Sequence, residues 1–450
     1  MSISIFGLIF FLLGAIAQLK KPSFIIYVLV LSTVLGAASA FDLAGKPILP
    51  GIFMLGFLCL YLLRVKDIEK YVIQAFQENP SVGYLLIFTA FSCLVSFFLP
   101  KFFGGEVWVY NVRDGQIVEQ LLVFSGSHIA QILYMLATFL FFLTVIILVR
   151  QIKYMIVFAD ALLVLGFINI VLGLSDLVFY NLGMTDYLTY LKNANYAIVD
   201  QSMSGVRRIA GSFSETSSFS GFTSGLLTFS FFIYRSGYRK KLSGFVALFS
   251  FLLVILATSS SGYICLAMLA VVLMYTERDY LFSGQLTKGS FLIVFFSFFT
   301  ACTLMLLFPQ QVLSILDSAI FNKLDSDSGI ERSEWNASAW DNFLKTYGFG
   351  VGLGGNKASN FLLVLLSNVG WFGLVLYVLF FFSALEGRST QSDATYNTIS
   401  GAAKAAVIVT FVPGLFAATS VFKGAFLCML LPMAARSKRL SGISRSFKRA

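Results

Sequence analysis

Apolar residues run along this chain in long blocks that shorter polar connections separate. A membrane-spanning helix needs about 20 mostly apolar residues, and the blocks that approach this size are residues 2–19, 22–40, 48–63, 83–99, 129–149, 154–174, 214–234, 242–257, 262–276, 290–308, 359–385, 402–419 and 424–435. Pro413 and Lys423 interrupt the last two blocks. The pattern predicts an all-α polytopic integral membrane protein, a single domain over residues 1–450, with about 11 to 13 transmembrane helices.

The composition agrees with a membrane protein and excludes a soluble globular one. Of the 450 residues, 58% are hydrophobic and only 12% are charged, whereas roughly a quarter of the residues of a soluble domain are charged. The first apolar block has no basic segment before it, so we expect a retained helix rather than a cleaved signal peptide. The five cysteines all lie in apolar blocks, which argues against a disulfide framework and a thiolate metal site.

The net charge of +10 is divided unevenly between the two sides of the membrane. When the connections are assigned alternately to the two sides, one set holds 21 lysines and arginines against 7 acidic residues, and the other holds 11 against 14. The positive-inside rule makes the first set cytoplasmic. Loops 100–128, 175–213 and 309–358 are then extracytoplasmic, and loops this long usually carry function. The charge thus orients the chain among membrane lipids and gives no reason to expect a nucleic acid partner.

The second extracytoplasmic loop, residues 175–213, ends in a segment suited to an anion. It contains Arg207 and Arg208, then small residues that include Gly211, and Glu215 follows where the next helix begins. Amides at a helix N-terminus carry partial positive charge, and guanidinium groups match phosphate oxygens. The alternative is that the arginines anchor at lipid headgroups and the glutamate only complements the helix dipole.

The third extracytoplasmic loop, residues 309–358, repeats this combination of cations and small residues. Arg332 stands in an acidic and aromatic stretch, and a glycine-rich segment that includes Gly352 leads to Lys357 and Ser359 just before the next helix. Glycine lets backbone amides approach a ligand closely. We therefore expect this helix start to favour a bound anion as well.

Three helices are expected to begin at this extracytoplasmic face. Ser212 or Ser214 is predicted to cap the first of them, which leaves Glu215 in its first turn. Another begins after the hairpin Thr258–Tyr263, whose hydroxyls either face the same site or form a plain capped turn. Three helix N-termini, two of them accompanied by arginines, predict a site for a doubly charged phosphate group, and a lipid pyrophosphate is the natural candidate.

Other ionisable groups are interpreted mainly as structural. Asp160 lies within an apolar block near its cytoplasmic end, and we expect a hydrogen-bonded carboxylate, the alternative being a part in transport. His128 is the only histidine and cannot form a metal cluster alone. Asp325 and Asp327 resemble the acidic pair of nucleotide-sugar enzymes, but they lie outside, and a calcium site needs about six or more oxygen ligands. No metal and no cofactor are expected.

At these residues the chain resembles the bacterial superfamily of O-antigen polymerases and O-antigen ligases, which are GT-C-like membrane glycosyltransferases. The resemblance rests on the segment Arg207–Glu215, the hairpin Thr258–Gly262 and the stretch from Arg332 to Gly355. The R-x15-G spacing of a polymerase outer loop occurs as Arg332 to Gly348, whereas its companion R-x10-G spacing does not occur.

Two departures favour the polymerase branch over the ligase branch. Ligases typically carry a histidine near the start of the helix after the large loop, and residues 356–360 contain none. A ligase-like hairpin often has an arginine after its serine, where this chain has Ser261. The resemblance to a polymerase is therefore the closer one.

The resemblance implies a reaction at the periplasmic face of the bacterial inner membrane. A glycan is transferred without a metal from undecaprenyl pyrophosphate to the terminal sugar of another lipid-linked repeat unit, and a chain-length regulator is a candidate partner. The residues expected to stabilise the leaving pyrophosphate are Arg207, Arg208 and Arg332. The candidates for the general base are Glu215, then Glu334 and Asp341.

Two other functions fit part of the pattern: a ligase-type glycan transferase, and a transporter or flippase of the same lipid-linked glycans. A flippase is expected to have internal pseudo-symmetry and polar groups that line a central cavity. Here the polar groups are concentrated in the outer loops. We therefore rank the transporter last.

Overall fold

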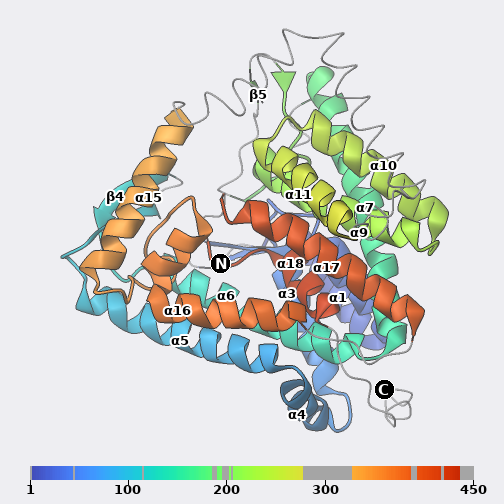
Figure 1. The fold of residues 1–450 in the computed structure, drawn as a ribbon, viewed down its shortest axis with the longest axis horizontal. Coiled ribbons are helices and arrows are strands. Elements are labelled where there is room, and N and C mark those ends of the chain that lie inside the picture. Colours follow the sequence, from blue (N-terminus) through green and yellow to red (C-terminus); the bar gives the residue numbers. More distant parts are fainter. Residues whose placement is uncertain are drawn as a thin grey trace.

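A computed structural model describes residues 3–43, 46–113, 116–184, 190–194, 202–203, 206–276, 327–386, 393–416 and 420–435. The helices are α1 (Ile5–Leu19), α2 (Pro22–Ser32), α3 (Pro50–Leu63), α4 (Ile68–Glu78), α5 (Pro80–Phe102), α6 (Gly126–Val149), α7 (Ile152–Asn181), α9 (Thr216–Arg235), α10 (Lys240–Leu256), α11 (Ser260–Thr276), α15 (Asp327–Lys345), α16 (Phe361–Glu386), α17 (Ala394–Gly414) and α18 (Ala425–Ala434) (Figure 1). The strands form three antiparallel pairs within this part of the chain, β1 (Phe41–Leu43) with β2 (Lys46–Ile48), β3 (Trp108–Arg113) with β4 (Gln116–Leu121), and β5 (Ser202–Met203) with β6 (Val206–Arg207).

Proline marks the first residue of three helices near the N-terminal end of the chain. Pro22, Pro50 and Pro80 begin α2, α3 and α5. The first helical position does not need an amide hydrogen, and the proline ring already holds the helical φ angle. These starts can therefore be read directly from the sequence.

The apolar blocks become helices. Every block except 290–308, which lies outside the described residues, overlaps a helix of the structure. Among the described residues, four helices, α5, α6, α7 and α16, are long and apolar enough to cross a membrane. Large apolar side chains such as Phe11 and Leu12 on α1 are more than half exposed, which suits contact with lipid rather than water. The protein is thus an all-α membrane protein, and the number of 11 to 13 spans stays a prediction.

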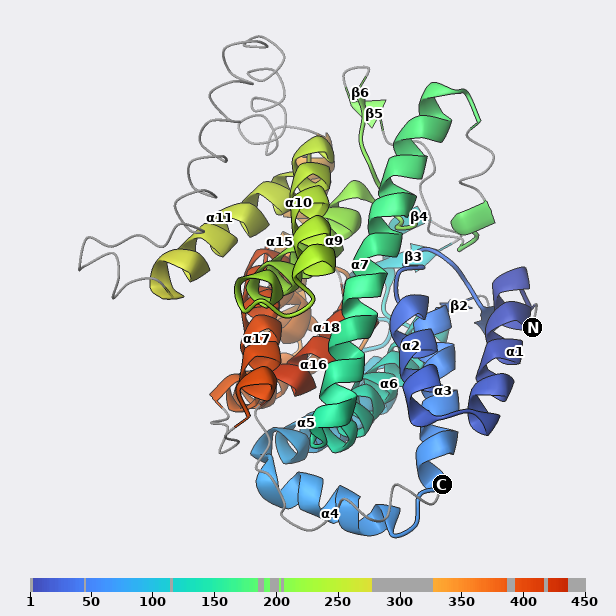
Figure 2. The same cartoon turned by 90° about the vertical axis from the view of Figure 1, so that its right-hand side faces the viewer.

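Three elements differ from the expectations drawn from the sequence. The short amphipathic helix α4 forms in a connection that was expected to be a loop, and it lies across one end of the molecule (Figure 2). The hairpin β3–β4 forms within the first extracytoplasmic loop. Helix α7 continues to Asn181, so the second loop begins later than residue 175. The third loop contains α15.

Connections that the charge bias assigns to the same side of the membrane contact one another. On the expected cytoplasmic side, Arg150 forms an ion pair with Glu78. On the opposite side, the amide of Ala37 donates to the carbonyl of Ser212 at 3.0 Å, and the amide of Lys357 donates to the carbonyl of Tyr110 at 2.8 Å. These contacts join segments far apart in the sequence, and they support the division of the connections into two sets.

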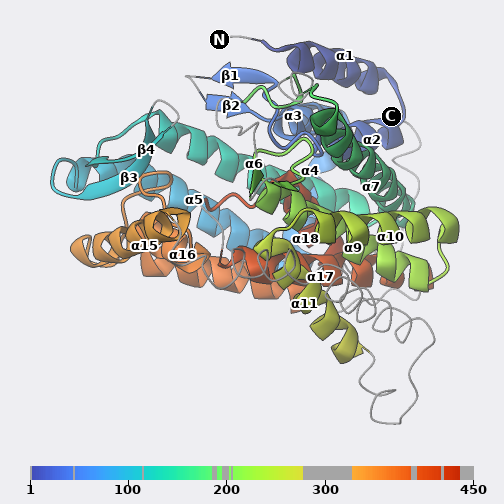
Figure 3. The ribbon, with the colours of Figure 1, turned by 90° about the horizontal axis from the view of Figure 1, so that it is seen from above.

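Close approach of helices builds the interior. Helix α9 packs against α10, α11 and α17, and α16 lies along α5 (Figure 3). A side-chain carbon at Gly225 of α9 would lie 2.6 Å from the ring of Phe426 of α18, so only glycine allows this contact. Gly370 interrupts the helical backbone of α16 with φ 67° and ψ −174°. The break gives room for the glycine-rich loop that precedes the helix.

Candidate functional site

A buried carboxylate anchors the loop that leads into α9. The side chain of Asp176 is fully buried near the end of α7, and its Oδ2 accepts the amides of Ala210 and Gly211, both at 2.8 Å. Gly211 has a φ of 54°, a conformation that favours glycine. The hydroxyl of Ser212 donates to the carbonyl of Val34 at 2.6 Å. The amide of Gly211 thus faces Asp176, and the glycine shapes the loop.

Helix α9 begins one residue later than expected. Its N-cap is Glu215, whose backbone is extended with φ −143° and ψ 153°, so the glutamate precedes the first turn rather than lying in it. The hydroxyl of Ser212 is engaged by another segment and does not cap the helix. The Glu215 side chain is exposed, and its Oε2 accepts the hydroxyl of Ser217 at 2.9 Å. The carboxylate is therefore held at the N-terminal end of α9.

The starts of α9 and α11 lie side by side. The hydroxyl of Ser261 is 3.4 Å from the carbonyl of Ser217, and it also lies 2.8 Å from the hydroxyl of Ser259. A side-chain carbon at Gly262 would lie 3.0 Å from Cβ of Ser220 on α9. The hairpin that was singled out in the sequence is therefore packed against the first turn of α9.

Arg208 brings the predicted residues together. We call the set Arg208, Glu215, Tyr263 and Arg332 the arginine cluster. Burial lowers the pKa of Arg208, Tyr263 and Glu215 act in the opposite direction, and the positive charge of Arg332 lowers the pKa further. The Nε of Arg208 is buried and has no hydrogen-bond partner within the described residues. Two guanidinium groups with one carboxylate leave a net positive charge, which attracts an anion.

The structure places none of the predicted residues Arg207, Asp325 and Asp341 in the arginine cluster. The backbone of Arg207 lies in β6, and its side chain lies outside the described residues, as does Asp325. Asp341 forms an exposed ion pair with Lys345 one turn along α15, at 2.7 Å. It stands nine residues after Arg332, about 13 Å along the helix. The structure thus does not bring Asp341 to the arginine cluster.

The glycine-rich loop is packed rather than open. Gly348, Gly350, Gly352 and Gly354 all have positive φ angles, between 75° and 88°. The amides of Gly350 to Leu353 donate in turn to Thr346 Oγ1, to the carbonyls of Ser367 and Asn368, and to Ser96 Oγ. Since the amide of Gly352 is already bonded to Asn368, it is not available to an anion. The glycines instead allow a buried loop to thread between α5, α6 and α16.

Asparagine side chains accept hydrogen bonds from the backbone amides at the start of α16. The side-chain oxygen of Asn336 on α15 accepts the amides of Ser359 at 2.9 Å and of Asn360 at 3.1 Å. The side-chain oxygen of Asn360 accepts the amide of Leu362 at 2.9 Å. Ser359 is buried, and Lys357 is held through its own amide by strand β3. The amides at the start of α16 are thus bonded to protein groups, whereas the Nε of Arg208 has no such partner within the described residues.

Strand β3 contributes a residue that the sequence did not single out. The amide of Tyr110 donates to Asn356 Oδ1 at 2.9 Å, so the strand is bonded to the segment that follows the glycine-rich loop. Burial raises the pKa of Tyr110, and the negative charges of Glu119 and Glu334 raise it further. Glu334 therefore lies near the hairpin, as the packing of α15 on β3 requires.

His128 and Asp160 have structural roles, as expected. His128 is fully buried, and its Nδ1 accepts the amide of Ser125 at 3.1 Å in a capping box at the start of α6. Asp160 accepts the hydroxyl of Tyr238 at 2.9 Å and two bonds from Arg239 at 3.1 and 2.9 Å. The interpretation of Asp160 as a hydrogen-bonded carboxylate is confirmed.

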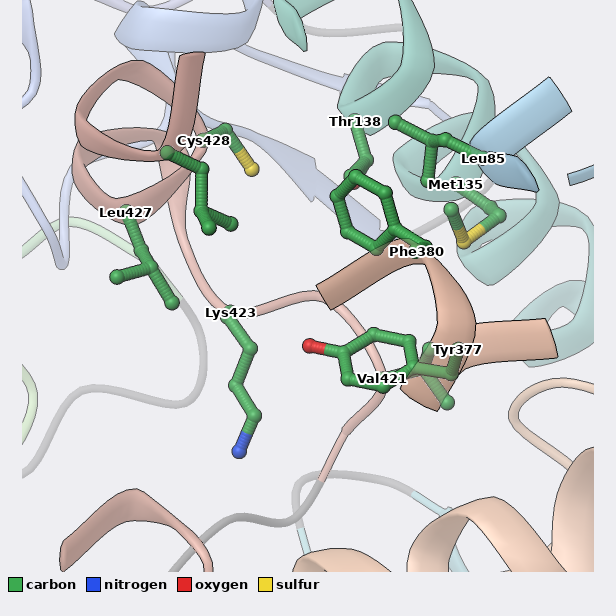
Figure 4. Close-up of a pocket in the computed structure, with 10 residues that line it drawn as sticks. Leu85, Met135, Thr138, Tyr377, Phe380, Val421, Lys423, Leu427 and Cys428 are labelled. Atoms are coloured by element: carbon green, nitrogen blue, oxygen red, sulfur yellow. The ribbon is translucent and has the colours of Figure 1, made fainter. Parts of the chain in front are cut away.

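A small cavity lies between α5, α6, α16 and α18 (Figure 4). It is lined by apolar side chains together with Thr138, Tyr377, Cys428 and Lys423, and it has room for about one water molecule. The Nζ of Lys423 donates to the carbonyl of Gly414 at 3.1 Å and lies 3.4 Å from the ring centroid of Phe361. Lys423 thus supplies a hydrogen-bond donor to the last carbonyl of α17, and the cavity is too small for a lipid or a sugar.

Comparison of the chain with protein-family models, curated proteins and solved structures gives no match. The arrangement of the arginine cluster is therefore the main evidence for a function. It joins the loop before α9, the start of α11 and helix α15, which are separated by long stretches of sequence.

Proposed function

We propose that this protein polymerises an O-antigen or a similar surface polysaccharide in the inner membrane of a bacterium. It transfers a glycan from undecaprenyl pyrophosphate to the terminal sugar of another lipid-linked repeat unit, with its site on the periplasmic side. The observation that carries the proposal is the arginine cluster. Within it the buried Nε of Arg208 has no protein partner in the described residues, while Glu215 and Arg332 act on Arg208 electrostatically.

The guanidinium groups of Arg208 and Arg332 match the leaving group. A guanidinium donates two parallel hydrogen bonds to phosphate oxygens. As the bond between the anomeric carbon and the pyrophosphate oxygen breaks, negative charge develops on that oxygen, and fixed donors stabilise it. One such donor is worth about 2.7 to 4 kcal/mol in other enzymes. Two arginines are thus able to supply this stabilisation without a metal ion.

Glu215 is the proposed general base. The acceptor hydroxyl forms the new bond to the anomeric carbon and gives its proton to the Glu215 carboxylate, while the electron pair of the broken bond leaves with the pyrophosphate. The Ser217 hydroxyl donates to the same carboxylate and holds it in place. Proton acceptance of this kind contributes about 10² to 10⁴ in rate. Asp341 is less suited to act as the base, because it lies in a surface ion pair.

The test is electrophoresis of the surface glycan from a strain that lacks this protein, complemented with the wild type, Arg332→Ala or Arg332→Lys. We expect single repeat units without the protein, a long ladder with the wild type, and no ladder with Arg332→Ala. Arg332→Lys should restore the ladder only in part because the bidentate fork is lost. A full ladder with both variants would remove Arg332 from the mechanism.

The same experiment distinguishes the alternative functions. Long polymer that accumulates on its lipid carrier in the deletion strain would identify an O-antigen ligase. Lipid-linked repeat units that accumulate at the cytoplasmic face would identify a flippase. The missing histidine near residues 356–360 is the sequence feature that ranks the ligase second.

A further inference from the structure

The hairpin β3–β4 presents an aromatic face away from the protein interior. Alternate residues of a strand point to opposite sides of the sheet. Val109 and Asn111 are buried, and Asn111 donates to the carbonyl of Gly354 at 2.9 Å, so this side faces the glycine-rich loop. Trp108 and Tyr110 therefore lie on the other side, where Trp108 is 52% exposed.

Two carboxylates flank these rings from different elements. Glu119 is the partner directly opposite Tyr110 in the antiparallel register of β4. Glu334 comes from α15, which packs on β3, and the charges of both glutamates act on Tyr110. Figures 1 and 3 both show the hairpin beside α15. Neither carboxylate forms an ion pair with another described residue.

We propose that Trp108, Tyr110, Glu119 and Glu334 form a binding face for sugar residues. A sugar ring has an apolar face of C–H groups, which packs on an aromatic ring, and hydroxyl groups at its edge, which donate to carboxylates. Two negative charges repel phosphate headgroups, and they are costly to bury against acyl chains. A sugar is therefore the ligand that suits both the aromatic rings and the carboxylates of this face.

The position of this face agrees with a lipid pyrophosphate that carries a glycan, and in this respect the inference rests on the proposed function. Arg332 and Glu334 are two residues apart on α15, about 3 Å along the axis and about 200° around it. One side of the helix thus offers positive charge for phosphate, and the other offers aromatic rings and carboxylates for sugar. Only the width of one helix, about 10 Å, separates them.

The experiment measures saccharide binding to the full-length protein in nanodiscs by saturation-transfer difference NMR. The probe is the free oligosaccharide released by mild acid from the surface polymer of the strain that makes this protein. The variants are Trp108→Ala and Glu334→Gln. The control is Trp371→Ala, which removes a tryptophan of similar exposure, 54%, from α16. Binding of farnesyl pyrophosphate is measured in parallel to show that each variant is folded.

We expect the wild type and the Trp371→Ala control to bind the oligosaccharide equally. Trp108→Ala and Glu334→Gln should each weaken saccharide binding about tenfold, with unchanged farnesyl pyrophosphate binding. Equal saccharide binding by Trp108→Ala and wild type, or none by the wild type, would overturn the inference. If the deletion strain keeps its ladder while Trp108 remains necessary for saccharide binding, the polymerase proposal fails and the sugar face stands.

Discussion

At the scale of single residues, Arg208 is the group whose environment most needs explanation. A buried polar atom without a hydrogen bond destabilises the fold unless a ligand supplies the missing partner. The Nε of Arg208 is in this state within the described part of the chain, and Arg332 adds repulsion rather than relief. Glu215 supplies compensating charge but forms no ion pair with Arg208 there. A bound phosphate group would supply both the missing hydrogen-bond acceptor and the remaining negative charge.

The substitution Glu215→Gln tests proton acceptance by this residue separately from pyrophosphate binding. The amide keeps the size of the side chain and its bond to the Ser217 hydroxyl, but it cannot accept the acceptor proton. We expect polymer synthesis in vitro to fall by about 10² to 10⁴, while farnesyl pyrophosphate binding stays within about twofold of wild type. Glu69→Gln, an exposed change on α4, serves as control and should leave both unchanged. Near-normal synthesis by Glu215→Gln would reject the general base.

At the scale of elements, the glycine-rich loop and the break in α16 depend on each other. A side-chain carbon at Gly370 would lie 2.3 Å from the carbonyl oxygen of Gly348 and 2.7 Å from that of Phe349. The loop can therefore pass over α16 only because residue 370 has no side chain. This packing also fixes the C-terminal end of α15, and with it the position of Arg332 on the same helix.

Gly370→Ala should destabilise the protein by about 2 to 5 kcal/mol, from the positive φ angle and the steric overlap together. The matched control is Gly401→Ala in α17, where a side-chain carbon meets nothing within 4 Å. This second change should be neutral or stabilise by up to about 1 kcal/mol. Thermal unfolding in detergent, followed by tryptophan fluorescence, compares the two. Equal melting temperatures would contradict the close approach of loop and helix.

At the scale of the whole molecule, the arginine cluster and the described ion pairs are divided between the two sets of connections. The arginine cluster and the strand pairs belong to connections of one set, while the pairs Arg150–Glu78 and Arg239–Asp160 belong to the other. The apolar helices between them are held by close packing, for example at Gly225. Such a division is what a bilayer imposes, because charged groups are costly in its centre.

Cysteine labelling checks which end faces the cytoplasm. In a protein whose five native cysteines are replaced, we introduce Ala337→Cys on the exposed side of α15, or Ser236→Cys between α9 and α10. A membrane-impermeant maleimide should label the first variant in intact spheroplasts and the second only after the membrane is opened. The reverse pattern would invert the orientation and exclude a periplasmic site.

Much of the architecture follows from local sequence. Because a bilayer acts on each segment separately, apolar length alone predicts where helices form, and each of the twelve blocks within the described residues overlaps one. Proline at the first helical position set the starts of α2, α3 and α5. The elements that were missed, α4 and the hairpin β3–β4, are short and amphipathic or exposed, and such elements depend on their neighbours for stability.

The sequence by itself thus determined the membrane class, most helices, the two sets of connections and the candidates Arg208, Glu215 and Arg332. Only the tertiary structure decided which candidates meet. It placed Glu215 and Arg332 where their charges act on Arg208, placed Glu334 where its charge acts on Tyr110, and bonded the amide of Gly352 to Asn368. The physical reason is that hydropathy and helix propensity act within a segment, whereas contacts between separate segments arise from how whole helices and loops pack.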